Sequence, residues 1–168
     1  MKNVIKPIIF DKSLKEKSAE LIIECEPIGK ARPRVTVRGP FAHAYTPKKT
    51  KSYENMIKNE YLNKYGYSNI LEGPLEAQIA AYFPIPKSSS KSLKKKMILN
   101  QYKHTNKPDI DNVQKAILDA LNGVAYSDDS QIIKITGQKF YSSTPRIELK
   151  LKEIKHDDSY KINVLEDT

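Results

Sequence analysis

The sequence predicts an α+β domain in which a mixed, mainly antiparallel sheet packs against two helices. Three observations predict this class: runs rich in β-branched and aromatic residues indicate strands, two segments with a 3.6-residue apolar period indicate helices, and no internal repeat is visible. A length of 168 residues favours one domain. We expect it at residues 18–154, between an N-terminal extension at 1–17 and a charged, frayed tail at 155–168.

The first half of the chain predicts strands followed by a helix. Residues 20–26 are apolar and β-branched, which indicates a first strand, and a turn at 38–40 precedes a return strand at 41–45. Thr46-Pro47 has the pattern of an N-cap followed by proline in the first turn, and the helical period continues to Tyr65. The apolar stripe of this helix is expected in the core or in a dimer contact: Tyr53, Met56, Ile57, Tyr61 and Leu62.

The second half predicts three strands and a short helix. Residues 75–84 indicate a strand that enters the core, and a serine among 88–90 is expected to cap a short basic helix. Residues 131–141 and 146–154 indicate two more strands, which we expect to pair as a hairpin. In the extension, the short apolar piece Ile8-Ile9-Phe10 suits an added edge strand.

Positive charge is concentrated in two stretches. The net charge is +9, and residues 27–53 and 86–107 each hold seven lysines or arginines and no acid. Such segregation is the footprint of a phosphate-binding surface, although two basic loops kept for solubility are the alternative. The candidate DNA contacts are Lys30, Arg32, Arg34, Lys48, Lys49, Lys51, Lys87, Lys94, Lys95 and Lys107.

Several function classes find no support in the sequence. No apolar run is long enough to span a membrane, no signal-peptide pattern or P-loop is visible, and no Cys/His spacing suits zinc. Cys25 is the single cysteine and lies in an apolar run, so we expect a buried structural thiol, no internal disulfide and a cytoplasmic protein. His104 is expected to be incidental rather than a ligand or base.

Acidic residues concentrate at 107–131, which holds five aspartates in a basic protein. Pro108 favours a helix that begins after it, with Asp109 or Asp111 as N-cap, and Asn122-Gly123 supplies a stop. Within that helix, at 111–121, one face is apolar and the opposite face carries three charges in a row. The apolar face comprises Val113, Ala116, Ile117, Ala120 and Leu121, and the charged face Asp111, Lys115 and Asp119.

These acids suit a divalent-cation site. Asp109 and Asp111 lie two residues apart, and a helix–turn–strand path could return Asp128 or Asp129 towards them. Carboxylate oxygens are the ligands of a hard cation such as Mg²⁺, and Lys115 beside them could neutralise charge on a phosphate. The alternative is a set of ordinary caps, a solvated turn and a surface ion pair.

The segment Lys-Pro-Asp-Ile-Asp-Asn-Val-Gln-Lys-Ala-Ile-Leu-Asp-Ala-Leu-Asn-Gly-Val-Ala-Tyr-Ser-Asp-Asp-Ser-Gln-Ile resembles the signature of the RusA family of Holliday junction resolvases. Gly-Lys-Ala-Arg-Pro-Arg and Tyr-Thr-Pro-x-x-Thr are looser likenesses. The resemblance implies a small homodimeric endodeoxyribonuclease that uses Mg²⁺, with Mn²⁺ as a substitute, and no small-molecule cofactor. It implies metal ligands at Asp109, Asp111 and Asp129, a functional lysine at Lys115, and less defined roles for Asp119 and Asp128, the latter a further candidate ligand.

The function expected from this resemblance is Mg²⁺-dependent resolution of four-way DNA junctions by paired symmetric cuts, in recombination and repair and in a prophage or phage setting. Two alternatives stay open. A non-catalytic basic DNA-binding module would need the lysines alone. A metal-dependent nuclease that acts on flaps, forks or single strands would use the same acids.

Overall fold

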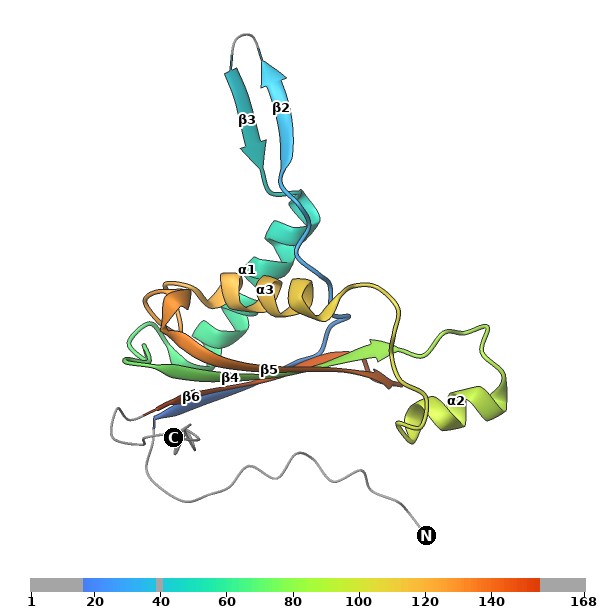
Figure 1. Ribbon diagram of the computed structural model, residues 1–168. Helices are drawn as coiled ribbons and strands as arrows, with labels where there is room; N and C mark the ends of the chain where they lie inside the picture. The colour runs from blue at the N-terminus through green and yellow to red at the C-terminus, as the bar shows by residue number, and fades with distance from the viewer. Residues whose placement is uncertain (1–16, 39–40, 155–168) are drawn as a thin grey trace, which may run out of the picture.

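A four-stranded sheet with two helices on one of its faces forms the body of the protein, seen in the computed structural model in Figure 1. The structure describes residues 17–38 and 41–154. The expected tail at 155–168 lies outside the described residues, as does the extension at 1–17 apart from Lys17, including its edge strand.

The sheet has the strand order β1-β6-β4-β5. Its strands are β1 (Ser18–Ile23), β4 (Leu75–Pro84), β5 (Ile132–Ser142) and β6 (Arg146–Glu153). β6 pairs antiparallel with both β1 and β4, whereas β5 runs parallel to β4, so the sheet is mixed and mainly antiparallel, as the sequence predicted.

The predicted hairpin between β5 and β6 is wrong, because β4 lies between them and pairs with both. β4 is the most apolar of the four strands, and six of its ten residues are buried. A strand of this composition is most stable at the centre of a sheet, where both of its edges are paired and its side chains leave water. The buried residues of β4 are Leu75, Ala77, Ile79, Ala80, Ala81 and Phe83.

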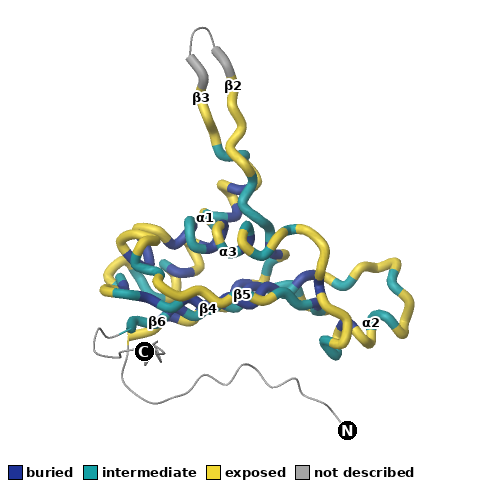
Figure 2. The backbone as a smooth tube through the Cα atoms, in the orientation of Figure 1, coloured by how far each residue is buried: buried dark blue, intermediate teal, exposed yellow. Residues whose placement is uncertain are grey.

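α1 (Lys48–Tyr65) and α3 (Ile110–Leu121) cover one face of the sheet (Figure 1). The burial of both helices follows their predicted apolar faces (Figure 2): α1 buries Tyr53, Ile57 and Tyr61, and α3 buries Val113, Ala116, Ile117, Ala120 and Leu121. The start of α1 differs from the prediction. Pro47, rather than Thr46, is the N-cap, and no side chain accepts a capping hydrogen bond there.

α2 (Lys91–Ile98) is the predicted short basic helix, and Ser90 is its N-cap. The Ser90 hydroxyl accepts a hydrogen bond from the backbone N–H of Leu93 at 3.3 Å. Met97 is the buried residue of this helix. α2 lies beyond the end of β4, and the chain then returns along residues 99–109 to the start of α3 (Figure 1).

β2 (Arg34–Arg38) and β3 (Phe41–Tyr45) form a separate two-stranded antiparallel sheet. This ribbon projects away from the body, just before the chain enters α1 (Figure 1). It confirms the return strand that the sequence predicted at 41–45.

Cys25 is half-buried beside Tyr53. Burial raises the pKa of the Cys25 thiol to about 11, against a smaller lowering effect of the hydrogen bond with Tyr53. The thiol is therefore protonated at neutral pH, which suits a structural role, but Cys25 is less buried than the sequence predicted. Among the described helices, none has the length and apolarity needed to cross a membrane.

Candidate functional site

Asp109 and Asp111 form a pair of free carboxylates at the start of α3. Asp109 is the N-cap residue, in extended conformation, but its side chain makes no capping hydrogen bond. Asp111 lies in the first turn, and both residues are exposed. Neither forms an ion pair within the described part of the chain. The positive end of the α3 dipole stabilises both charges. The start of α3 therefore presents to solvent two carboxylates that have no capping hydrogen bond or ion pair within the described residues.

A network from β5 holds the loop that leads to these acids. The Lys139 ammonium donates to the backbone carbonyls of Asn106 at 2.8 Å and Pro108 at 3.0 Å. The Asn106 side-chain amide donates to the Tyr141 hydroxyl at 3.3 Å. Two contacts to the carbonyls on either side of Lys107 fix the path of the chain immediately before Asp109.

His104 anchors the middle of the same loop, which spans residues 99–109. Its ring stacks on Phe83 at 4.1 Å between centroids and lies 4.7 Å from the ring of Tyr141. Burial, and then the nearby Lys139 charge, lower the pKa of His104, so the imidazole is neutral at physiological pH. Its Nδ1 is buried without a hydrogen-bond partner. The histidine therefore packs in the protein rather than facing the acids.

Replacing Lys139 with methionine should destabilise the protein by about 2 kcal/mol, because two hydrogen bonds from a charged, part-buried donor are lost. Urea denaturation measures the change, and faster amide exchange at Lys107 would locate it in the loop. Lys96, exposed on α2, provides the control, and Lys96→Met should change stability by less than about 0.5 kcal/mol. Equal stabilities for the two variants would contradict an anchoring role.

Asp119, Asp128 and Asp129 gather at the opposite end of α3, around Tyr126. Burial raises the pKa of the Tyr126 hydroxyl, and the charges of these three carboxylates raise it further. The Tyr126 hydroxyl donates to the Leu118 carbonyl at 2.7 Å, which ties this turn to the last turn of α3. The second acidic group therefore has a fixed position relative to the helix.

The three acids of this second group differ in what they bind. Asp128 is the N-cap of the short 3₁₀ segment Asp129–Gln131 and accepts from the Ser130 N–H at 2.9 Å. Hydrogen bonding with the Ser130 side chain, and then with its backbone N–H, lowers the pKa of Asp128. Asp119 pairs with Lys30 at 2.8 Å. Asp129 is exposed, and no side-chain hydrogen bond or ion pair engages it within the described residues. Asp129 is thus the freest carboxylate of the group.

The structure does not bring the predicted aspartates together within one protomer. α3 has 12 residues, and a rise of 1.5 Å per residue separates its two ends by about 18 Å. Consistently, the described residues contain no group of three His, Cys, Asp or Glu side chains able to hold a metal ion. Lys115 is exposed on α3, one turn after Asp111 and between the two acidic groups.

A basic groove lies beside the start of α3. The Lys30 backbone N–H donates to the Asn112 carbonyl at 2.8 Å, and an added Cβ on Gly29 would stand only 2.8 Å from the Pro108 Cβ. The segment that crosses here then lines a groove of about 430 Å³ together with the start of α1. Arg32, Arg34 and Lys49 are the cationic residues of this groove.

Lys30 itself takes part in an internal network. Its ammonium binds the carboxylates of Glu54 and Asp119. Burial alone would lower the pKa of Lys30, but the hydrogen bonds to Asp119 and Glu54 outweigh it, and the net pKa is raised. The alternating basic residues predicted to act together are therefore divided, with Lys30 turned to α1 and α3 and Arg32 and Arg34 exposed.

The remaining predicted DNA contacts lie on two exposed surfaces. Lys48 and Lys51 are exposed on the first turns of α1. Lys87 and Lys95 are exposed before and on α2, and Lys107 is exposed next to Asp109. The Lys94 ammonium donates to the Lys87 carbonyl at 3.0 Å. Sequence reasoning missed the role of Lys139, for which no local pattern gave a signal.

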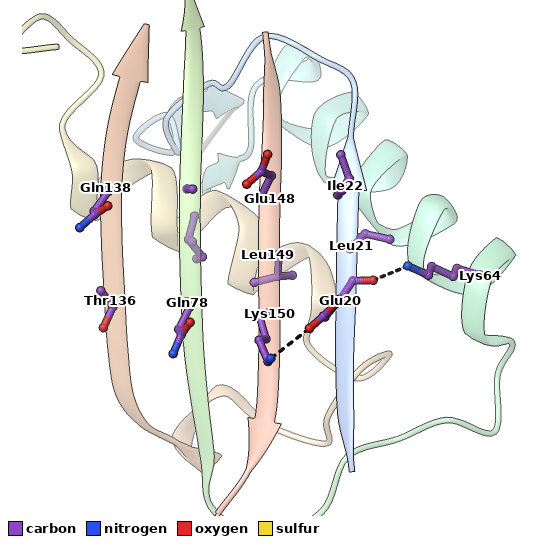
Figure 3. Close-up of a pocket in the computed structure, with 12 residues that line it drawn as sticks. Glu20, Leu21, Ile22, Lys64, Gln78, Thr136, Gln138, Glu148, Leu149 and Lys150 are labelled. Carbon is purple, nitrogen blue, oxygen red and sulfur yellow. Dashed lines mark hydrogen bonds and ion pairs between the residues drawn. The ribbon is translucent and has the colours of Figure 1, made fainter. Parts of the chain in front are cut away.

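A second groove, of about 500 Å³, lies on the sheet face that the helices leave uncovered. Its charged groups already have partners: Lys150 pairs with Glu20 at 3.0 Å, and the Lys64 ammonium donates to the Glu20 carbonyl at 2.7 Å (Figure 3). Apart from these, its lining is mostly apolar or amide. It offers no free carboxylate pair like that at the start of α3.

The chain is similar to a family model and to a bacterial protein. A family model described as endodeoxyribonuclease RusA matches residues 24–152. The Bacillus subtilis (strain 168) protein YqaN, described as uncharacterized, is 36% identical over 131 residues, which cover 77% of this chain and 92% of YqaN. Both acidic groups and the basic groove lie inside the matched residues.

Proposed function

The chain belongs to the RusA endodeoxyribonuclease family, and from that premise we propose that it resolves four-way DNA junctions by paired, symmetric, Mg²⁺-dependent cuts during recombination and repair. One observation carries the proposal. The exposed carboxylates of Asp109 and Asp111 lie at the start of α3, next to a groove lined by Arg32, Arg34 and Lys49. Carboxylates that can bind a cation therefore lie next to basic side chains that can bind phosphates.

The donor set at the start of α3 fits Mg²⁺. This ion is typically held by one or two carboxylates, with water and substrate phosphates completing its shell. Asp109 and Asp111 are exposed and offer hard oxygen donors, which Mn²⁺ also accepts. A bound divalent ion supplies an activated water and stabilises the developing oxyanions in phosphodiester hydrolysis.

The role proposed for Lys115 follows from its position. It is exposed one helical turn after Asp111, on the charged face of α3. From there its ammonium would orient the scissile phosphate and balance charge on its oxygens. Asp109 and Asp111 would keep the cation opposite it.

Asp129 joins this site most simply through a second copy of the chain. A four-way junction has two-fold character, and two symmetric cuts require two equivalent sites, which a C₂ homodimer provides. β5 is an edge strand, with Ile133 and Ile135 exposed on it. β5 begins three residues after Asp129 and passes the start of α3 at Gly137, whose Cβ position faces Gln114 and Ile110.

A second copy lying antiparallel along β5 would therefore carry its own Asp109 and Asp111 towards Asp129 of the first. Each site would then take two carboxylates from one protomer and one from the other. Asp128 would flank the site as a further candidate ligand. This arrangement accounts for acids that lie at opposite ends of one helix.

Mixing two inactive variants tests the shared site. Heterodimers of Asp111→Asn and Asp129→Asn protomers contain one site with both changes and one site with neither, so the mixture should regain nicking of one strand while each variant alone stays inactive. The measurement is nicked product on a labelled junction after refolding the two together. Mixed protomers that stay inactive, although heterodimers form, would mean that each site lies within one protomer.

The basic residues are proposed to hold the sugar–phosphate backbone. Lys48, Lys49 and Lys51 lie on the first turns of α1, where the helix dipole disfavours cations and a bound phosphate would relieve that cost. Lys87, Lys94, Lys95 and Lys107 would bind a second stretch of backbone. Neutralising several phosphates makes affinity fall steeply with salt.

Lys49→Ala should weaken junction binding and lower the slope of log affinity against log salt by about 0.9, because one phosphate contact is lost. The measurement is a salt titration of binding in the absence of divalent ions. Lys58→Ala is the matched control, since Lys58 is exposed on the same helix but away from the groove. Equal slopes for both variants would remove Lys49 from the interface.

The decisive experiment compares fixed and mobile four-way junctions with linear duplex, flaps, forks and single strands, with Mg²⁺ and with EDTA, and maps every cut. The proposal expects symmetric paired cuts on junctions in Mg²⁺ alone. Binding without cleavage in either condition would indicate a non-catalytic DNA-binding module. Preferential cutting of flaps, forks or single strands would replace the four-way junction as the proposed substrate but leave the proposed metal site unchanged.

A further inference from the structure

The β2–β3 ribbon has no third strand and no covering layer in the described part of the chain. Its described side chains are all exposed, with Val35 63% and Tyr45 44% accessible (Figure 2). An isolated two-stranded ribbon is only marginally stable in water. A ribbon that extends from the body in this way gains stability when a partner covers it.

The register gives the ribbon two different sides. Arg34 lies opposite Tyr45, Val35 opposite Ala44, and Thr36 opposite His43. Residues directly opposed in an antiparallel pair point to the same side, and successive residues alternate. One side therefore presents Arg34, Tyr45, Thr36 and His43, with hydrogen-bonding and aromatic groups, while the other presents Val35 and Ala44.

Charge identifies the kind of partner. Residues 27–53, which include the whole ribbon, hold seven cations and no acid. Two such ribbons would repel each other, whereas a polyanion would be attracted. The ribbon also begins at the basic groove of Arg32, Arg34 and Lys49. The same segment touches the start of α3, where the Lys30 N–H donates to the Asn112 carbonyl at 2.8 Å.

We propose that the β2–β3 ribbon lies in the major groove of a DNA arm next to the cut, with the Thr36/His43/Tyr45 side turned to the base edges. A two-stranded ribbon fits the width of this groove, where base edges can be read. Arg32, Arg34 and Lys49 then bind the phosphates at the groove's rim. This inference rests on the proposed action on DNA and adds where and how an arm is recognised.

The length of the ribbon sets its reach. Each strand has five residues, which span about 17 Å when extended. That length covers about five base pairs at 3.4 Å per step. Because the segment that leads into the ribbon contacts the start of α3 at Asn112, the contacted base pairs lie within about one helical turn of the scissile phosphate.

Dimethyl sulfate footprinting of the full-length protein on a four-way junction tests the ribbon, because it probes guanine N7 in the major groove. The experiment is run in EDTA, so that the DNA stays intact. Wild-type protein should protect guanines over about five base pairs in an arm. Substituting Thr36→Ala together with His43→Ala should abolish that protection and weaken binding about tenfold, as expected for lost base contacts. The salt slope should stay unchanged, because no phosphate contact is removed.

Val35→Thr is the matched control, since Val35 lies on the other side of the same strand and the change keeps a β-branched side chain. It should footprint and bind like the wild type. Wild-type footprints and affinity for the Thr36/His43 double variant would overturn the proposal. So would loss of dimer in that variant by analytical ultracentrifugation, which would make the ribbon a contact between protomers.

The result is separable from that for the proposed nuclease activity. Protection that depends on Thr36 and His43, with no cleavage in Mg²⁺, would support the ribbon and reject the nuclease. Cleavage in Mg²⁺ by a protein that gives no major-groove protection would support the nuclease and reject the role of the ribbon.

Discussion

An Asp111→Asn variant is expected to cut four-way junctions on the order of 1000-fold more slowly than the wild type, while binding them at least as tightly. The change keeps the side chain's size and removes one of the two free carboxylates at the start of α3. Loss of that charge removes a ligand of the proposed cation site and also reduces repulsion of the DNA backbone. Single-turnover cleavage rates in Mg²⁺ and binding constants in EDTA measure the two effects separately.

Glu60→Gln is the matched control, because Glu60 is an exposed carboxylate on α1, away from α3's start. It should cut at the wild-type rate. Normal cleavage by Asp111→Asn, with its fold intact by circular dichroism, would show that the acids at the start of α3 are not the catalytic centre.

Ile117→Ala should lower the free energy of unfolding by about 3–4 kcal/mol, because a fully buried side chain of α3 is truncated in a close-packed layer. Ile117 lies in the middle part of α3, between the two acidic groups. Its truncation should therefore destabilise the packing of the whole helix against the core. Urea denaturation gives the change, provided that the slope of the transition is unaltered.

The same truncation at Ile22 serves as the control, since Ile22 is 64% exposed on the uncovered sheet face. Ile22→Ala should cost less than about 1 kcal/mol in the monomer. If both variants lost similar stability, either a second copy covers the Ile22 face or α3 does not contribute as its burial implies.

The sequence predicted most elements because their signals are local. The apolar period of α3, the Ser90 cap of α2 and the β-branched run of β4 each lie within a few residues. The predicted β5–β6 hairpin is wrong because the partner of a strand depends on which other strands of the chain compete to pair with it. β4 is the more apolar strand and takes the position between them.

The candidate site also combines features that local sequence predicts with features that depend on distant parts of the chain. Asp109 and Asp111 could be predicted together, because a helix start fixes residues two apart. The position of Asp129 could not, because it depends on the full length of α3. Lys30 and Lys139 bind groups far away in the chain, Glu54 and the Asn106 carbonyl, and a lysine carries no sign of such a partner in its own neighbourhood.

The parallel pairing of β4 and β5 also bears on how the molecule assembles. The two strands are separated by residues 85–131, which include α2 and α3. Closing so long a connection costs chain entropy before any strand contact repays it, and non-local topology slows folding. β6 follows β5 in the chain, so the β4–β6 and β1–β6 pairings join residues that are even further apart in sequence, and the whole sheet should form late in folding. The two acidic groups flank β5, so a nascent chain would complete the proposed cation site only after this sheet has formed.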